Sequence, residues 1–233
     1  MGSGSYRYRN GQLDETIDFL MLSYFHLETL LPRLFAFLIA MTLHDAAHAG
    51  TAWLLGDRTA REGKRLSLNP LAHLDALGLA MIAFGPYGWS KKLPVDVARF
   101  RLRPRLSNTL VYLAGPFMNL LLVFFFWWLN FFLPSWIGGG IETMAVEQWR
   151  VYLQYCVIVN LMVLIIHILP LYPLDGWYIL KGLAASHNQS WFERNERYGL
   201  LLVLLLMITP IGQWGLAHAY PIAAQLVMNI FAL

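Results

Sequence analysis

The sequence predicts an all-α integral membrane protein, a polytopic helix bundle with a re-entrant, partly extended segment at residues 66–90. Three observations carry this prediction. Hydrophobic residues make up 58% of the 233 residues and charged residues only 13%, which excludes an ordinary soluble domain. Several apolar runs approach or exceed the roughly 20 residues that a helix needs to cross a bilayer. Nine tryptophans and eleven tyrosines fit side chains that lie near lipid headgroups.

Three apolar runs are long enough to cross the membrane. The first covers about residues 31–55, the second Leu106–Pro134 and the third Gln148–Pro170. A polar or amphipathic segment, residues 1–30, precedes them. The chain therefore divides into three parts: this N-terminal segment, a membrane-embedded core at 31–180, and a C-terminal loop with membrane helices at 181–233.

Residues 66–90 are apolar but do not fit a simple crossing, because Asn69-Pro70 and Gly85-Pro86 interrupt the run. Lys and Arg favour the cytoplasmic side of a membrane, and here they flank the segment on both sides. Irregular backbone at membrane depth must be satisfied by protein or by a water-filled cavity. We therefore expect a re-entrant segment that walls a cavity, between two basic loops that hold Arg58, Arg61, Lys64 and Arg65 before it and Lys91, Lys92, Arg99, Arg101, Arg103 and Arg105 after it.

The charge pattern also indicates partners and orientation. The net charge is +3, and the basic residues lie in loops, which favours membrane lipid headgroups over nucleic acid as their partners. Residues 135–147 contain two glutamates and no Lys or Arg, so they should face the opposite side. We expect a multi-pass protein of a prokaryotic plasma membrane, and a homo-oligomer is compatible with the sequence.

The pattern His44-Asp45-Ala46-Ala47-His48 predicts a metal site at the end of the first apolar run. Residues at i and i+4 lie on one face of a helix, so both imidazoles can reach one ion. A zinc site with an open position for water needs a third protein ligand, and Asp175 is the candidate. His167 lies eight residues before Asp175 in an apolar run and can project into the same cavity.

Beyond this motif, the chain resembles the site-2 protease family over roughly residues 36–180. The resemblance rests on blocks in the family's order: Thr42–Ala49; Ser67–Leu71 with His73, Asp75 and Gly78; Tyr87–Trp89 with Leu93–Val95; Leu113–Pro116 with Asn119; and Leu169-Pro170 leading to Pro173–Gly176. It implies an intramembrane zinc endopeptidase that cuts transmembrane protein substrates near the cytoplasmic face. The zinc ligands would be His44, His48 and Asp175.

Two positions differ from the family's pattern. Asp45 stands where the family has its general base, a glutamate, and its reach is one methylene shorter. Asp45 is either a working base or the mark of an impaired or inactive relative that binds membrane segments or a partner protein. His167 stands where the family usually has an asparagine. Its ring can contact the developing oxyanion, act as a fourth zinc ligand, or simply pack in the bundle.

Asn69 and Asn119 lie beside Pro70 and Pro116, where helices break. Each can hold an extended substrate strand, and we expect that role for both. Alternatively, each satisfies loose backbone at a break.

Overall fold

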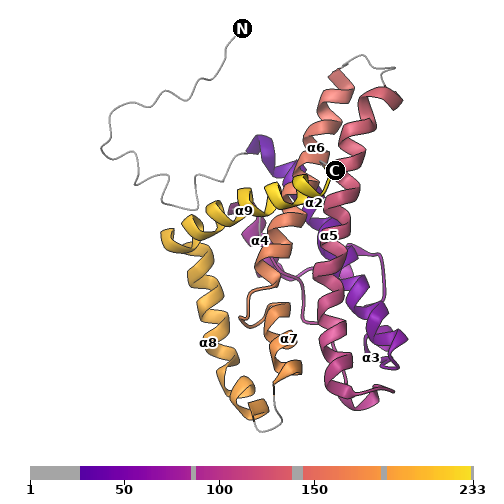
Figure 1. Ribbon diagram of the computed structural model, residues 1–233, viewed down its shortest axis with the longest axis vertical. Coiled ribbons are helices and arrows are strands. Elements are labelled where there is room, and N and C mark those ends of the chain that lie inside the picture. Colours follow the sequence, from indigo (N-terminus) through magenta and orange to yellow (C-terminus); the bar gives the residue numbers. More distant parts are fainter. Residues whose placement is uncertain (1–26, 85–87, 138–143, 185–187, 232–233) are drawn as a thin grey trace.

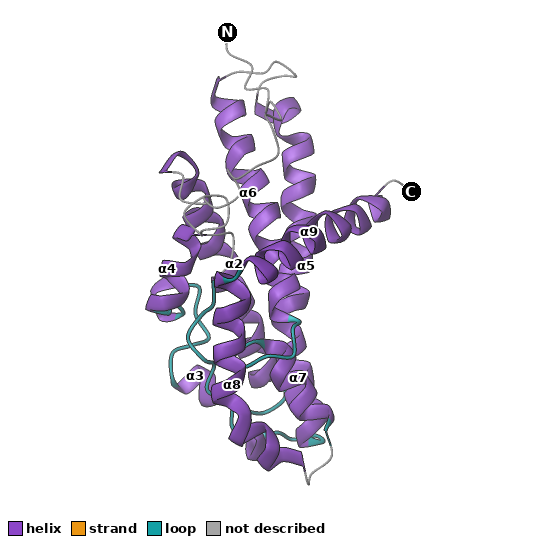
Figure 2. Ribbon diagram, turned by 90° about the vertical axis from the view of Figure 1, so that its left-hand side faces the viewer, coloured by secondary structure: helices purple, strands orange, loops and turns teal. Residues whose placement is uncertain are grey.

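The computed structural model describes residues 27–84, 88–137, 144–184 and 188–231. Most of the predicted N-terminal segment lies outside these residues. The main helices are α2 (Leu27–Leu54), α5 (Pro104–Ile137), α6 (Met144–His167), α8 (Gln189–Ile208) and α9 (Pro210–Phe231). Shorter elements are α3 (Thr59–Glu62), η2 (Pro70–Ala72), α4 (Ala76–Phe84), η3 (Val97–Arg99) and α7 (Asp175–Leu183). The prediction of an all-α protein is confirmed (Figure 2).

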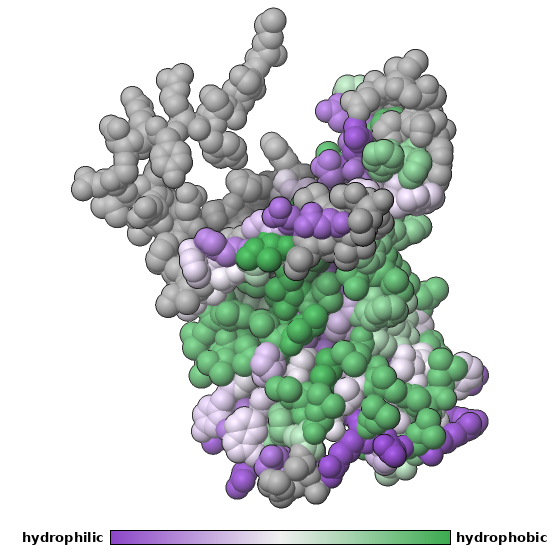
Figure 3. All heavy atoms as spheres, in the orientation of Figure 1, coloured by the Kyte–Doolittle hydropathy of each residue, from purple (hydrophilic) through white to green (hydrophobic). Residues whose placement is uncertain are grey.

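The helices α2, α5 and α6 form the central bundle, and each packs against the other two (Figure 1). Their shared core includes Phe37 and Met41 of α2, Phe126 of α5, and Leu153 and Val163 of α6. These are the three helices that are long and apolar enough to cross a membrane, and they match the three predicted crossings. Apolar side chains cover the middle of the face shown in Figure 3, with polar side chains gathered at its lower edge. The chain is a multi-pass membrane protein.

The C-terminal part adds a hairpin of α8 and α9. In Figure 1, α8 rises beside the bundle and α9 lies across it, in contact with α6. Neither helix is among the candidate spans within the described residues. The number of crossings after residue 183 therefore does not follow from length and hydropathy.

The two basic loops lie together at one end of the bundle. The backbone N–H of Arg101 donates to the carbonyl of Leu55 at 3.0 Å. The buried Asp57 carboxylate accepts from the backbone N–H of Asp96 at 2.8 Å, and Arg99 forms an ion pair with Glu62 at 3.0 Å. The segment between the loops therefore leaves and returns at the same end of α2.

That segment is more helical than its sequence suggested. Ala76–Phe84 form α4, whose first turn is capped by Asp75: its Oδ1 accepts from the backbone N–H groups of Leu77 and Gly78 at 3.0 Å. Among the described residues of 66–90, extended pairing is limited to one antiparallel bridge between Leu74 and Ser90. A short, uniformly apolar run has no periodicity that separates a helix from a buried strand, which is why α4 was not predicted.

Gly78 allows α4 to pack directly on the backbone of Trp89, because a Cβ at position 78 would collide with the Trp89 carbonyl group. Gly78→Ala is therefore expected to lower the thermal unfolding midpoint in detergent micelles, although alanine favours a helix over glycine by about 1 kcal/mol. Gly215→Ala in α9 is the matched control, since a Cβ there meets no described atom within 4 Å. The control should leave the midpoint unchanged or raise it. Equal effects of the two substitutions would contradict the packing argument.

Candidate metal centre

The helix α2 presents His44 and His48 toward the interior of the bundle, one turn apart. Both are buried, with 1% and 2% of their surface exposed, and their Nε2 atoms lie 2.9 Å from each other. The spacing of i and i+4 therefore brings the two imidazoles to one point, as the sequence predicted.

The neighbouring helix α5 fixes the tautomer of His48. Its Nδ1 lies 2.6 Å from the backbone carbonyl oxygen of Val111. A carbonyl oxygen can only accept, so Nδ1 must carry the proton. In the neutral ring the Nε2 atom then has a free lone pair, and this is the atom that faces His44.

A chain of two asparagines fixes the tautomer of His44 in the same way. The carbonyl oxygen of Cys156 accepts from Nδ2 of Asn160 at 2.7 Å, and Oδ1 of Asn160 accepts from Nδ2 of Asn119 at 2.9 Å. Oδ1 of Asn119 is thereby left to accept from Nδ1 of His44. The backbone of α6 thus determines both amide orientations and, through them, which nitrogen of His44 has the free lone pair.

Gly115 makes the close approach of α2 and α5 possible. A Cβ at this position would collide with Nε2 of His48 and with the ring of His44. Residue 115 must therefore be glycine if both histidines are to stand against α5.

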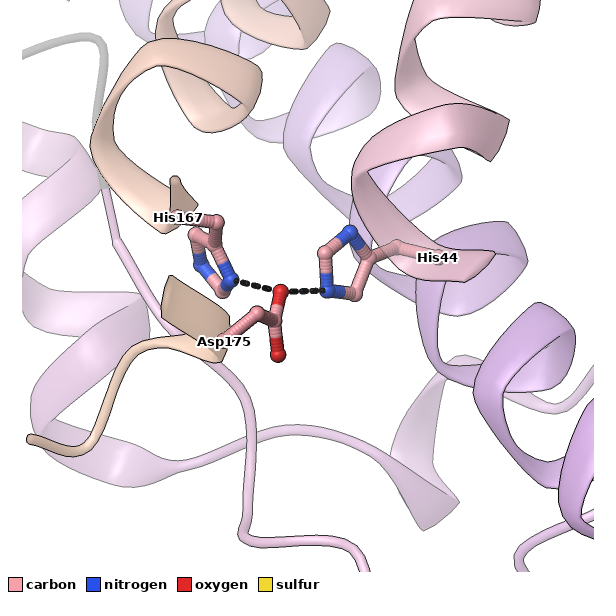
Figure 4. A group of neighbouring side chains, drawn as sticks. All are labelled: His44, His167 and Asp175. Carbon is pink, nitrogen blue, oxygen red and sulfur yellow. Dashed lines mark hydrogen bonds and ion pairs between the residues drawn. The ribbon is translucent and has the colours of Figure 1, made fainter. Parts of the chain in front are cut away.

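Asp175 reaches the same point from α7, of which it is the first residue. Its Oδ2 lies 3.0 Å from Nε2 of His44 and its Oδ1 lies 3.2 Å from Nε2 of His48. The partial positive charge at a helix N-terminus stabilises a carboxylate there. His167, the last residue of α6, brings its Nδ1 within 2.8 Å of the Asp175 Oδ2 (Figure 4).

These atoms could together hold a metal ion. Two Nε2 lone pairs and a carboxylate repel one another unless a cation lies among them, and two histidines with one carboxylate are a ligand set of catalytic zinc. Burial raises the pKa of the Asp175 carboxyl, but when no metal is bound, protons taken up by the imidazoles of His48, His44 and His167 outweigh burial and hold that pKa well below its usual range. A bound metal ion would supply the positive charge while the rings stay neutral.

The side chain of Asp45 belongs to a second polar cluster, next to the candidate metal ligands. Its Oδ1 accepts from the Ser90 hydroxyl at 2.8 Å, and its Oδ2 lies 3.0 Å from both Nη2 of Arg65 and Nδ1 of His73. The other ring nitrogen of His73 donates to the carbonyl oxygen of Ser67. The atoms that face the two ring nitrogens of His73 are therefore both hydrogen-bond acceptors.

A small cavity of about 40 Å³ connects the two clusters, and it is lined by His44, Asp45, His48, His167 and Asp175. Its volume has room for a few water molecules. A larger groove of about 750 Å³ adjoins it between α5, α7 and α8. The two spaces share four lining residues: Lys92, Leu93, Tyr112 and Tyr178.

The structure thus brings together all five residues that the sequence placed at the metal and at its reaction. It places the two predicted substrate residues apart from each other. Asn69 is exposed, and its Oδ1 caps η2 by accepting from the backbone N–H of Leu71. Asn119 is fully buried behind His44, and both ends of its amide are occupied.

Four neighbours of the site were not predicted from the sequence: Asn160, Arg65, His73 and Ser90. Asn160 had a visible signal, because it is a single polar residue within the apolar run Val157–Ile166. Arg65 and Ser90 had none, since a basic loop residue and a serine are common in any chain.

Asn119→Leu is expected to weaken zinc binding by about 10- to 100-fold, because the Nδ1–H of His44 loses its acceptor and the ring is no longer held in the binding orientation. Asn119→Asp keeps an acceptor oxygen and should lose less. Asn130→Leu, further along α5, is the control and should retain the affinity of the parent chain. Competition with a chelating dye measures all three. Unchanged affinity in Asn119→Leu would refute the role given to the asparagine chain.

Comparison with known proteins agrees with this site. The chain is 33% identical to the Bacillus subtilis protein named "Putative zinc metalloprotease YwhC" over 202 residues, which cover 84% of this chain and 88% of the relative. It is 28% identical to the Mycolicibacterium smegmatis protein named "Putative zinc metalloprotease Rip2", with 78% and 69% covered. The Mycobacterium tuberculosis protein of that name is 26% identical, with the same coverage.

No solved structure matches the chain significantly. Residues 32–210 match Peptidase family M50, and this range includes every residue of the metal centre and of the Asp45 cluster. The chain therefore belongs to Peptidase family M50, as a zinc metalloprotease of that family.

Proposed function

We propose that this protein is an intramembrane zinc endopeptidase that cleaves transmembrane segments of membrane proteins near the cytoplasmic face. The observation that carries the proposal is the position of the donor set. His44 and His48 belong to a helix that is long and apolar enough to cross a membrane, and their lone pairs converge with the Asp175 carboxylate inside the bundle. Ionisable groups inside a membrane-embedded bundle are costly unless they are paired, so their presence indicates a functional site.

In this proposal His44, His48 and Asp175 hold the zinc ion. When bound, zinc supplies a Lewis acid that polarises a carbonyl group and acidifies water. Asp45 is the general base: it lines the same cavity, accepts a proton from the attacking water and passes it to the leaving amine. His167 is the second catalytic residue, because a ring N–H in this cavity can donate to the oxygen on which negative charge develops.

The large groove is the proposed binding site for the substrate chain. A transmembrane helix must unwind before a peptide bond can reach the metal, and an extended strand can pair with exposed backbone. The extended backbone near the Leu74–Ser90 bridge is suited to such pairing, and Lys92 lies where the groove meets the cavity. Asn69 can contact the strand directly. Asn119 can do so only after releasing His44 or Asn160.

Residues 66–90 are the proposed re-entrant segment, with both basic loops on the cytoplasmic side of a prokaryotic plasma membrane. The support is the direct contact between the loops, through the Arg99–Glu62 ion pair and the bond from Asp96 to Asp57. Two loops in contact lie on one side of the bilayer. The basic side chains there are available to anionic headgroups.

A second function, binding membrane segments without cleaving them, is favoured by the hydrogen bonds of Asp45. Arg65, His73 and Ser90 together engage both of its oxygens. A carboxylate held in this way gives up part of its capacity to accept a proton from water. Turnover, rather than zinc content, separates this function from the first.

Membrane topology is tested by single cysteines in a Cys156→Ala background. Glu62→Cys and Arg99→Cys should both react with an impermeant maleimide from the cytoplasmic side, because the two native side chains touch. Glu147→Cys, exposed at the start of α6, should react from the other side. Labelling of positions 62 and 99 from opposite sides would overturn the re-entrant assignment.

Position 45 tests the chemistry in a cleavage assay with purified protein and a transmembrane substrate. Asp45→Glu should raise turnover, since glutamate restores the reach of the base, and a tenfold gain corresponds to about 1.4 kcal/mol off the barrier. Asp45→Asn should abolish cleavage because an amide cannot take the proton. Zinc content should be equal in all three forms. Equal turnover in the Asp, Glu and Asn forms would rule out Asp45 as the base, and no turnover in any of them would favour the binding function.

A further inference from the structure

His167 is held against the metal centre by a tight reversal of the chain. It ends α6, Asp175 begins α7, and the loop between them folds so that the two side chains face each other (Figure 4). Gly176 allows the reversal, because a Cβ there would collide with the backbone carbonyl groups of Ile168 and Leu169. His167 and Asp175 are only 4% and 6% exposed. The position of the ring is therefore set by the fold.

The distances place Nδ1 of His167 among the metal donors. Tetrahedral zinc with bonds of about 2.0–2.1 Å holds neighbouring ligand atoms about 3.3 Å apart. The Asp175 carboxylate lies 3.0 Å from His44, 3.2 Å from His48 and 2.8 Å from His167. His167 thus lies about as far from the Asp175 carboxylate as the two histidines of α2 do. The nitrogens of His44 and His167 and the Asp175 oxygen also lie within 4.8 Å of one another, close enough for a single ion.

The other contacts of His167 do not account for its burial. Its Nε2 has no hydrogen-bond partner among the described residues. Within the described part of the chain, the hydrogen-bonding partner of the His167 ring is Asp175, and the centroid of this imidazole lies 4.6 Å from that of His44. These contacts of His167 are therefore with two of the candidate metal ligands.

We propose that His167 is a fourth protein ligand, so that His44, His48, His167 and Asp175 close the zinc site in the resting protein. This inference rests on the zinc site of the proposed function. A catalytic zinc site keeps one position open, whereas four protein ligands fill a tetrahedral site. Hydrolysis then requires the His167 ring to leave the metal before water or a substrate carbonyl can take its position. Histidine at position 167, where the family usually has asparagine, therefore keeps the zinc site inactive until the ring moves away.

The test compares the full-length protein with His167→Leu, after each is loaded with zinc or with Co²⁺. X-ray absorption should count three imidazoles in the parent and two in the variant. Zinc affinity should fall by more than the roughly 100-fold upper range that is typical of losing an outer-shell contact. The Co²⁺ absorption bands, which are intense in tetrahedral sites, should weaken in the variant as water enters. His218→Leu, at an exposed histidine on α9, is the control and should match the parent.

A second variant keeps the proposal falsifiable if His167→Leu folds poorly. His167→Cys places a thiolate at the same position, and a thiolate-to-cobalt charge-transfer band appears only if residue 167 reaches the metal. Absence of that band, with two imidazoles in both parent and His167→Leu, would overturn the fourth ligand and leave the zinc site of His44, His48 and Asp175 intact. A folded parent that takes up no metal would overturn the zinc site itself, and the fourth ligand with it.

Discussion

The candidate metal centre depends on two hydrogen bonds between α2 and α5, in which the Nδ1–H groups of His44 and His48 donate to acceptors on α5. Val111 accepts one proton through its carbonyl oxygen, and Asn119 accepts the other through its amide. Each bond turns the remaining nitrogen inward, toward Asp175. The i, i+4 spacing alone would place the rings side by side without deciding which nitrogen is free. The contact also requires Gly115, so the packing of the bundle and the chemistry of the site are fixed by the same helix pair.

The Asp45 cluster joins this centre to the segments that surround it. Arg65 comes from the first basic loop, while His73 and Ser90 come from the two sides of the bridged segment. Arg65 also donates to the carbonyl oxygen of Lys91, which ties the two loops to each other. A buried carboxylate needs such partners, because an unpaired charge in the bundle costs several kcal/mol. A strand that displaced this segment would therefore also change the hydrogen bonds of the residue next to the metal ligand His44.

Asp45 and His167, the two positions that differ from the pattern of the site-2 protease family, line the same cavity. Asp45 has a shorter side chain than glutamate, and its oxygens are taken up by three donors. His167 is larger and more basic than asparagine, and its Nδ1 is within hydrogen-bond distance of the Asp175 carboxylate. The hydrogen bonds of Asp45 and the contact of His167 with Asp175 both agree with the proposal that the zinc site is closed in the resting protein.

The sequence by itself determined the parts that depend on local pattern. The lengths of the apolar runs identified the three long apolar helices, with ends that differ from the structure by a few residues. The spacing of His44 and His48 correctly predicted that the two rings meet on one face of the first helix. Asp175, named as the candidate third ligand, does meet these two rings. The short helix α4 was missed because nine apolar residues carry no period that distinguishes helix from strand.

Only the tertiary structure decided the partners of the site residues. Asn119 is 75 positions from His44 in the chain, and Ser90 and His73 are 45 and 28 positions from Asp45. Contacts at these separations arise from the packing of whole helices, and no local pattern encodes which of two ring nitrogens faces inward. The same holds for His167, whose ring meets Asp175 because α6 ends and α7 begins at one point in space. Residue spacing specified which groups could bind a metal, and packing decided how each of them is oriented.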